Sequence, residues 1–97
     1  MHTKEQLREI VVQCVLELSD LEVKPEEIVL STDPIEELGL DSHDGVAVIC
    51  ILEDKLGTEF PPKFNPLVDD QRHKSRKISE IIEALNSLIT QKEHSNK

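Results

Sequence analysis

Aromatic residues are almost absent from this 97-residue chain, which has no Trp or Tyr and only Phe60 and Phe64. Base stacking on aromatic rings is a main way of binding single-stranded nucleic acid. The formal net charge of −9 would also repel a phosphate backbone. We therefore expect no nucleic-acid partner, and a protein partner with a basic surface is the kind that this charge attracts.

Long hydrophobic runs are missing as well. No apolar stretch approaches the roughly 20 residues that span a bilayer, and the first residues carry no apolar signal-peptide core. Two cysteines, Cys14 and Cys50, form neither a disulfide framework nor a zinc motif. We therefore expect a cytoplasmic protein, without membrane insertion, in which both thiols are reduced and buried.

The chain is short enough for a single domain, which we place at residues 1–90, followed by a polar tail at 91–97. Its charge is uneven: residues 1–60 hold 15 acidic side chains against 4 Lys or Arg, whereas residues 61–97 hold 5 against 7. We therefore expect the surface that attracts partners through negative charge to lie in residues 1–60. The second region contains a local basic cluster, which is a solvated loop, an internal counter-charge or a partner contact: Arg72, His73, Lys74, Arg76 and Lys77.

Two segments near the ends have the apolar period of amphipathic helices. Residues 3–18 place apolar side chains at steps of three and four, after a capping box formed by Thr3 and Gln6. Residues 78–89 repeat the period and predict the last helix. Each helix needs a partner for its apolar stripe, so the sequence predicts an all-α fold, a small bundle of three main helices plus one short helix.

The remaining long segments contain breakers. Residues 19–41 hold spaced apolar side chains interrupted by prolines and a glycine, which predicts an ordered loop with short turns of helix that covers the bundle. Residues 57–77 form a long connection. A short helix there could begin at Asn65, with Pro66 at its first position.

Residues 41–56 predict the middle helix, with Asp41 as N-cap and Gly57 as C-cap. Its continuous apolar run is also compatible with a buried strand. As a helix, it has a wider apolar surface than one core stripe needs. Part of that surface would then face outward for docking. On this alternative Cys50 would be exposed rather than buried. The outward residues would be Val46, Ala47 and Cys50.

No catalytic constellation is present, so we predict that the protein is not an enzyme. No two histidines have the i, i+4 spacing of a helical metal site, and three glycines make no phosphate-binding loop. We therefore predict no metal site. The scattered histidines are His2, His43, His73 and His94.

One segment is different, because a serine follows a Gly-containing turn at the start of a predicted helix: Glu37-Leu38-Gly39-Leu40-Asp41-Ser42-His43-Asp44. It resembles the modification site of acyl carrier proteins, whose G-x-D-S segment carries 4′-phosphopantetheine on the serine. The resemblance extends over residues 3–90. It implies that Ser42 bears the cofactor and that Asp41 helps the modifying transferase to bind its metal ion.

A helix N-terminus suits such a group, since its N–H groups are unpaired and its partial charge is positive. The negative side chains of Asp41 and Asp44 counteract this partial positive charge. No base is positioned to activate Ser42, and the resemblance implies that the separate transferase supplies the activation. His43 is adjacent to Ser42 and should not face it.

The resemblance also implies the mechanism. The cofactor thiol holds acyl groups as thioesters, and the carrier, expected to be a monomer, delivers them to enzymes of fatty-acid, lipid or polyketide-type biosynthesis. Its partners would be a phosphopantetheinyl transferase and acyl-processing enzymes with basic docking patches. Candidate docking residues are His43, Asp44, Val46, Ala47, Cys50, Glu53 and Asp54. Candidate residues for an acyl-chain cavity, which could equally be ordinary core, are Val48, Ile49, Leu52, Ile78, Ile82 and Leu85.

Three departures from the family pattern suggest a specialised carrier. His43 stands where Leu is usual, acids are missing from 46–52, and the connection 57–77 is longer and basic at its end. Two alternatives remain. A peptidyl or aminoacyl carrier shares the bundle and the serine, and a helical interaction module without cofactor would use Ser42 only as a cap.

Overall fold

The protein is described by a computed structural model covering residues 3–95, with side chains as far as Gln91. The predicted fold class, a bundle of three long helices and one short helix, is confirmed, although the short helix is not at the predicted place and a small two-stranded hairpin is added. In chain order the elements are α1 (Lys4–Leu18), the 3-10 helix η1 (Pro25–Glu27), α2 (Pro34–Glu37), α3 (Asp44–Leu56), β1 (Val68–Asp69), β2 (Lys74–Ser75) and α4 (Ile78–Ser95).

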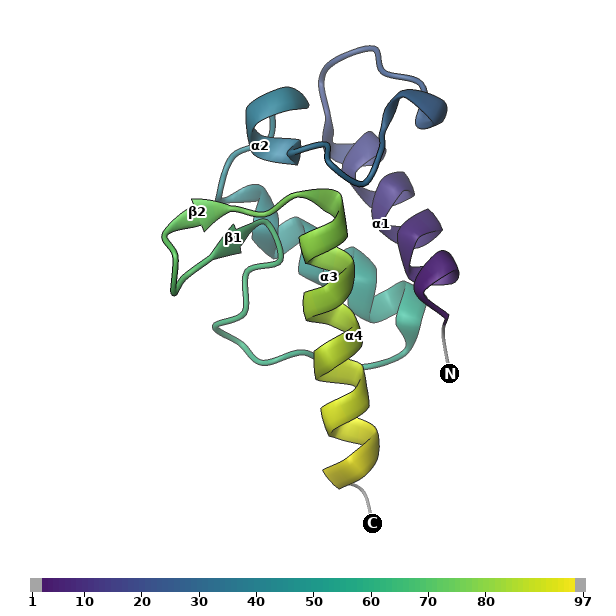
Figure 1. Ribbon diagram of the computed structural model, residues 1–97, viewed down its shortest axis with the longest axis vertical. Helices are drawn as coiled ribbons and strands as arrows, with labels where there is room; N and C mark the ends of the chain where they lie inside the picture. The colour runs from purple at the N-terminus through teal and green to yellow at the C-terminus, as the bar shows by residue number, and fades with distance from the viewer. Residues whose placement is uncertain (1–2, 96–97) are drawn as a thin grey trace.

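Helix α1 packs against both α3 and α4, so the core lies among the three long helices (Figure 1). The loops contribute further buried side chains that cover the bundle, as predicted, although Leu21, Val29 and Leu30 remain about half exposed. The buried apolar residues are Leu7, Val11, Cys14, Val15, Ile28, Leu38, Leu40, Val48, Leu52, Phe60, Leu67, Ile78, Ile81, Ile82 and Leu85.

The helix ends follow the capping rules. Gln6 N–H donates to Thr3 Oγ1 at 3.1 Å and Thr3 N–H donates to Gln6 Oε1 at 2.9 Å, which confirms the capping box. Gly57 adopts a left-handed φ of 65° and ends α3. Helix α4 continues to Ser95, past its predicted end at residue 89 and into the expected polar tail; residues 96 and 97 lie outside the described part.

The short helix predicted at Asn65 and Pro66 is wrong; the short helix of the fold is α2. Asn65 Oδ1 accepts from Leu67 N–H at 2.9 Å, as an N-cap residue would. Only one turn follows, because the chain enters β1 at Val68. The chain then forms the hairpin, in which β1 and β2 pair antiparallel. Its turn closes on Asp69, whose Oδ1 accepts from the N–H groups of Gln71 and Arg72.

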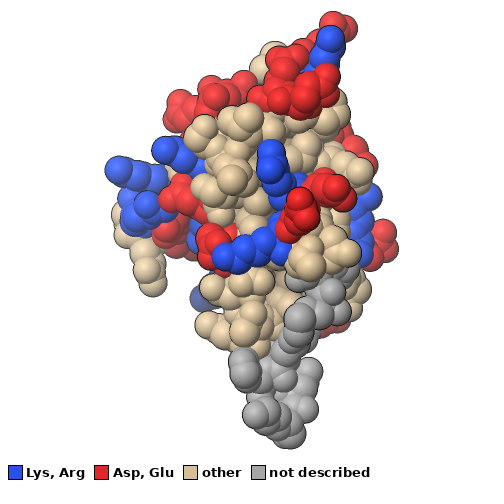
Figure 2. All heavy atoms as spheres, turned by 45° about the vertical axis from the view of Figure 1, so that its right-hand side comes forward, with Lys and Arg blue, Asp and Glu red and all other residues tan. Residues whose placement is uncertain are grey.

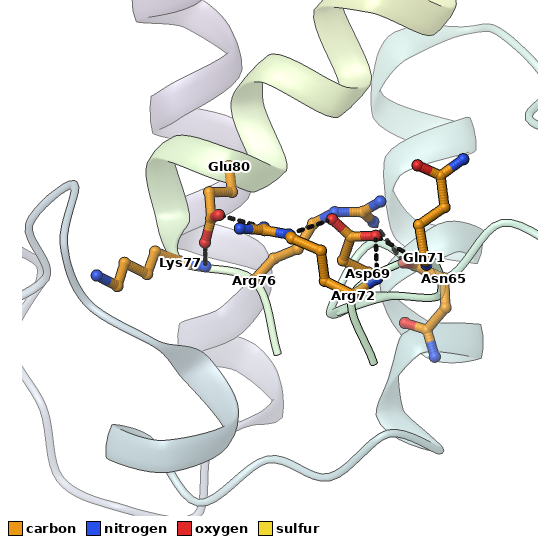
Figure 3. Close-up of polar contacts among 7 residues, drawn as sticks. All are labelled: Asn65, Asp69, Gln71, Arg72, Arg76, Lys77 and Glu80. Carbon is orange, nitrogen blue, oxygen red and sulfur yellow. Dashed lines mark hydrogen bonds and ion pairs between the residues drawn. The ribbon is translucent and has the colours of Figure 1, made fainter. Parts of the chain in front are cut away.

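An ion cluster ties the hairpin to α4 (Figure 3). Arg72 donates from Nε to Asp69 Oδ2 at 2.8 Å and from Nη2 to Glu80 Oε2. Hydrogen bonds from the Arg72 guanidinium lower the pKa of both carboxyls, and Glu80 and Asp69 in turn raise the pKa of Arg72. Of the three interpretations of the basic cluster, an internal counter-charge therefore applies to Arg72.

The two cysteines occupy different environments. Cys14 is fully buried, and burial raises the pKa of its thiol to about 12, with the charge of Glu17 adding to the shift. Cys50 is exposed on α3, so the prediction that both thiols are buried is wrong for Cys50. The position of Cys50 on the outward side of α3 is the reason.

Acidification tests the ion cluster. Because the pKa of Asp69 and of Glu80 is depressed in the folded state, their contribution to stability is complete above about pH 4.5, the ordinary value for Glu80, and is lost below it. Arg72→Met should flatten this dependence, and Lys74→Met, an exposed neighbour, should not. The urea midpoints at pH 7 and pH 3 measure how much stability each protein loses on acidification. An equal loss in the wild type and in Arg72→Met would contradict the role of the ion cluster.

Thiol titration tests the cysteine assignment. In the protein without cofactor, a disulfide reagent should react rapidly with Cys50, because the thiolate is the reacting form and Cys14 is buried with a raised pKa. Cys50→Ser should remove the fast phase, and urea should release the slow thiol. Rapid reaction of the folded Cys50→Ser variant would refute the assignment.

Candidate functional site

Ser42 lies in an exposed turn immediately before α3. Three backbone bonds of the i to i+3 type close this turn: Asp44 N–H to Asp41 O at 3.1 Å, Gly45 N–H to Ser42 O at 3.2 Å, and Val46 N–H to His43 O at 3.3 Å. Such bonds make a tighter, 3-10-like turn. The regular helix therefore begins at Asp44, three residues after the predicted start.

The N-cap residue of α3 is His43, which makes no side-chain cap bond, so the prediction of Asp41 as N-cap of the helix is wrong. Asp41 instead caps the turn before α3. Its Oδ1 accepts from His43 N–H at 2.8 Å and from Asp44 N–H at 3.2 Å. Asp44 Oδ2 accepts in return from Asp41 N–H at 2.9 Å, which makes the two carboxylates a reciprocal cap. These bonds use N–H groups at the helix start, so the prediction that those groups are unpaired and free for a phosphodiester is wrong.

The Ser42 side chain keeps its hydroxyl free. The residue is exposed, and no hydrogen bond within the described residues engages its Oγ. The His43 ring next to it is 95% exposed, with Nδ1 at 3.7 Å from Asp41 Oδ1. The hydroxyl is therefore open to an external enzyme.

Asn65, which no sequence motif marks as a site residue, also contacts the turn. Its Nδ2 donates to Ser42 O at 2.9 Å across 23 residues of sequence. Gly45 makes room for this amide, because a Cβ at position 45 would lie 2.1 Å from Asn65 Oδ1. A glycine inside a helix usually has such a packing reason, which is the one sequence signal that was available.

The candidate docking residues lie on α3 or immediately before it, and they differ in exposure. Val46 is 72% exposed and Cys50 is exposed, which confirms their predicted orientation, while Ala47 is half-buried. Asp54 is exposed. Glu53 is half-buried and its Oε2 accepts from Phe60 N–H at 2.9 Å, so this carboxylate also anchors the connection.

The candidate cavity residues lie in the core. Ile49 is half-buried against the core cluster, and the other five are at most 4% exposed: Val48, Leu52, Ile78, Ile82 and Leu85. In this structure they act as packing side chains from α3 and α4. Their role as an acyl-chain lining stays a prediction.

Figure 2 shows acidic side chains gathered at the top of the molecule, whereas Lys and Arg side chains lie at its left and across its middle, mixed with acidic ones. Among the described residues, no three His, Cys, Asp or Glu side chains group as metal ligands. Within that same range, no helix has the length and apolarity needed to cross a membrane.

Comparison with known proteins gives the family. The model of the family described as "Phosphopantetheine attachment site" matches residues 9–64. An acyl carrier protein of Campylobacter hominis is 30% identical over 88 residues, which is 91% of this chain and 95% of the relative. An acyl carrier protein of Thermosynechococcus vestitus is 29% identical over 69 residues, which is 71% of this chain and 76% of the relative. No solved structure matches the chain.

The chain therefore belongs to the phosphopantetheine-binding family of acyl carrier proteins. It is a carrier rather than an enzyme, and its prosthetic group is 4′-phosphopantetheine. The resemblance found in the segment around Ser42 is thus confirmed at the level of the family.

A substitution at Gly45 tests the packing of the turn. Gly45→Ala should destabilise the protein by about 1–3 kcal/mol, because the new methyl group must displace the Asn65 amide. In an Asn65→Ala background the same change should be neutral or stabilising, since Ala favours a helix over Gly by about 1 kcal/mol. Urea unfolding of all four proteins measures the coupling; the same loss in both backgrounds would argue against the contact.

Proposed function

We propose that Ser42 is the attachment residue of this carrier and that the cofactor is held there as a phosphodiester. The observation that carries the proposal is the free, exposed hydroxyl of Ser42 at the start of α3. Serine at a helix start normally caps the helix with its own hydroxyl. Here Asp41 makes those bonds, and Ser42 remains open to modification.

The neighbouring side chains fit this role. Asp41 uses Oδ1 alone for both capping bonds, so Oδ2 is available for a metal ion held by the transferase, as the resemblance implies. Among the described residues, no hydrogen bond joins the Ser42 hydroxyl to a base, and the His43 ring extends into solvent. Activation of the hydroxyl therefore falls to the phosphopantetheinyl transferase.

Once attached, the group supplies a thiol that holds acyl chains as thioesters. Within the domain, the core side chains between α3 and α4 could shelter such a chain if the helices separate, which is the role proposed for Val48, Ile49, Leu52, Ile78, Ile82 and Leu85. The carrier would deliver its cargo to enzymes of fatty-acid, lipid or polyketide-type biosynthesis.

We further propose that its partners are a specialised set. The docking surface would begin at His43 and Asp44 and continue along α3 over Val46, Ala47, Cys50, Glu53 and Asp54. Its centre is apolar, with Val46 largely exposed, and its carboxylates lie at the ends of the helix. Such a surface favours partners that combine an apolar contact with flanking basic groups.

Intact mass spectrometry tests the attachment residue. Incubation with coenzyme A and a broad-specificity transferase should add one phosphopantetheine to the wild type. Ser42→Ala should abolish the gain, because the attacking oxygen is gone. Ser31→Ala is a matched control at another exposed serine in a turn and should be modified normally. A mass gain on Ser42→Ala would refute the assignment.

A further inference from the structure

The long connection between α3 and α4 contacts the serine-bearing turn directly. Asn65 Nδ2 donates to Ser42 O at 2.9 Å, and the same carbonyl accepts from Gly45 N–H at 3.2 Å. The peptide group that follows Ser42 is thereby fixed from two directions. Asp41 Oδ1 in addition accepts from the N–H groups of His43 and Asp44, the two residues that follow Ser42.

The orientation of the Asn65 amide is fixed in turn. Leu67 N–H donates to Asn65 Oδ1 at 2.9 Å, so the oxygen must face Leu67 and the NH₂ group must face Ser42. An aspartate at this position could keep the first bond but could not donate the second. The contact is therefore specific for an amide.

Arg76 holds this part of the connection from behind (Figure 3). Its Nη1 donates to Asn65 O at 2.7 Å, and its guanidinium carbon lies 5.2 Å from the centre of the Phe64 ring. Its own N–H donates to Leu67 O at 2.8 Å. Arg76, which directly follows β2, thus holds Asn65 in the position from which it contacts Ser42.

We propose that Asn65 is a positioning residue for the modification of Ser42, and that Arg76 acts through it. The inference rests on the proposed function of Ser42. Asn65 restricts the turn so that the Ser42 oxygen meets the transferase in one position. In that reaction the oxygen forms the new bond to phosphorus, and its proton passes to the transferase. The bond between the two phosphates of coenzyme A breaks, and adenosine 3′,5′-bisphosphate leaves.

Steady-state kinetics of the transferase, with carrier concentration varied, test the proposal. Asn65→Ala should lower kcat about five- to tenfold, the effect of losing one positioning hydrogen bond. KM should stay within about twofold of the wild-type value, because the docking side of α3 is unchanged. Asn65→Asp should lose at least as much, since its second oxygen would face Ser42 O.

The division between kcat and KM separates positioning from stability. A variant that is only less stable contains less folded carrier, which raises the apparent KM and leaves kcat unchanged at saturation. Gln71→Ala is the matched control, because the Gln71 backbone N–H, not its amide, bonds to Asp69. Arg76→Lys is a milder variant for use if Asn65→Ala does not fold, and it should lower kcat by a smaller factor.

The outcomes are distinguishable. A modified wild type together with an unchanged kcat for Asn65→Ala would overturn this inference and leave the proposed function intact. If the wild type takes no cofactor, the proposed function of Ser42 fails, and the role of Asn65 fails with it. A fall in kcat for Gln71→Ala equal to that for Asn65→Ala would also overturn the inference.

Discussion

The cap that Asp41 provides to the turn before α3 is the interaction on which the site depends. A helix start leaves N–H groups that need acceptors, and a serine at that place would normally supply one with its hydroxyl. Asp41 accepts from both His43 and Asp44, and Asp44 completes the pair by accepting from Asp41. The Ser42 hydroxyl is thereby released from a structural task, and a residue at a helix start becomes available for chemistry.

The rest of the fold supports this arrangement from behind. Val48 and Leu52 are buried in the core, where α3 packs against α1, so the helix start has a fixed place. Asn65 connects the turn to the long connection, and the Arg72 ion cluster connects the hairpin to α4. The long connection between α3 and α4 is therefore the segment that contacts Ser42.

The sequence predicted well what depends on local chemistry. Apolar steps of three and four predicted α1 and α4, whereas α3 was predicted from its flanking capping signals. Thr3 and Gly57 marked helix ends correctly, since capping bonds join residues close in sequence. The contact between Asn65 and Ser42 could not be predicted, because it joins residues 23 positions apart and depends on how the connection folds. The hairpin was missed for a related reason. Strands of two residues have no period, and an Asn-Pro pair suits a helix start as well as a turn.

The central claim is that the phosphopantetheine of this carrier is attached to Ser42. Fragmentation of the intact modified protein in a mass spectrometer tests it most directly, since each fragment shows on which residues the added mass lies. The account predicts that fragments ending at Asp41 are unmodified and that those ending at Ser42 carry the whole addition. An addition on any other residue would contradict it.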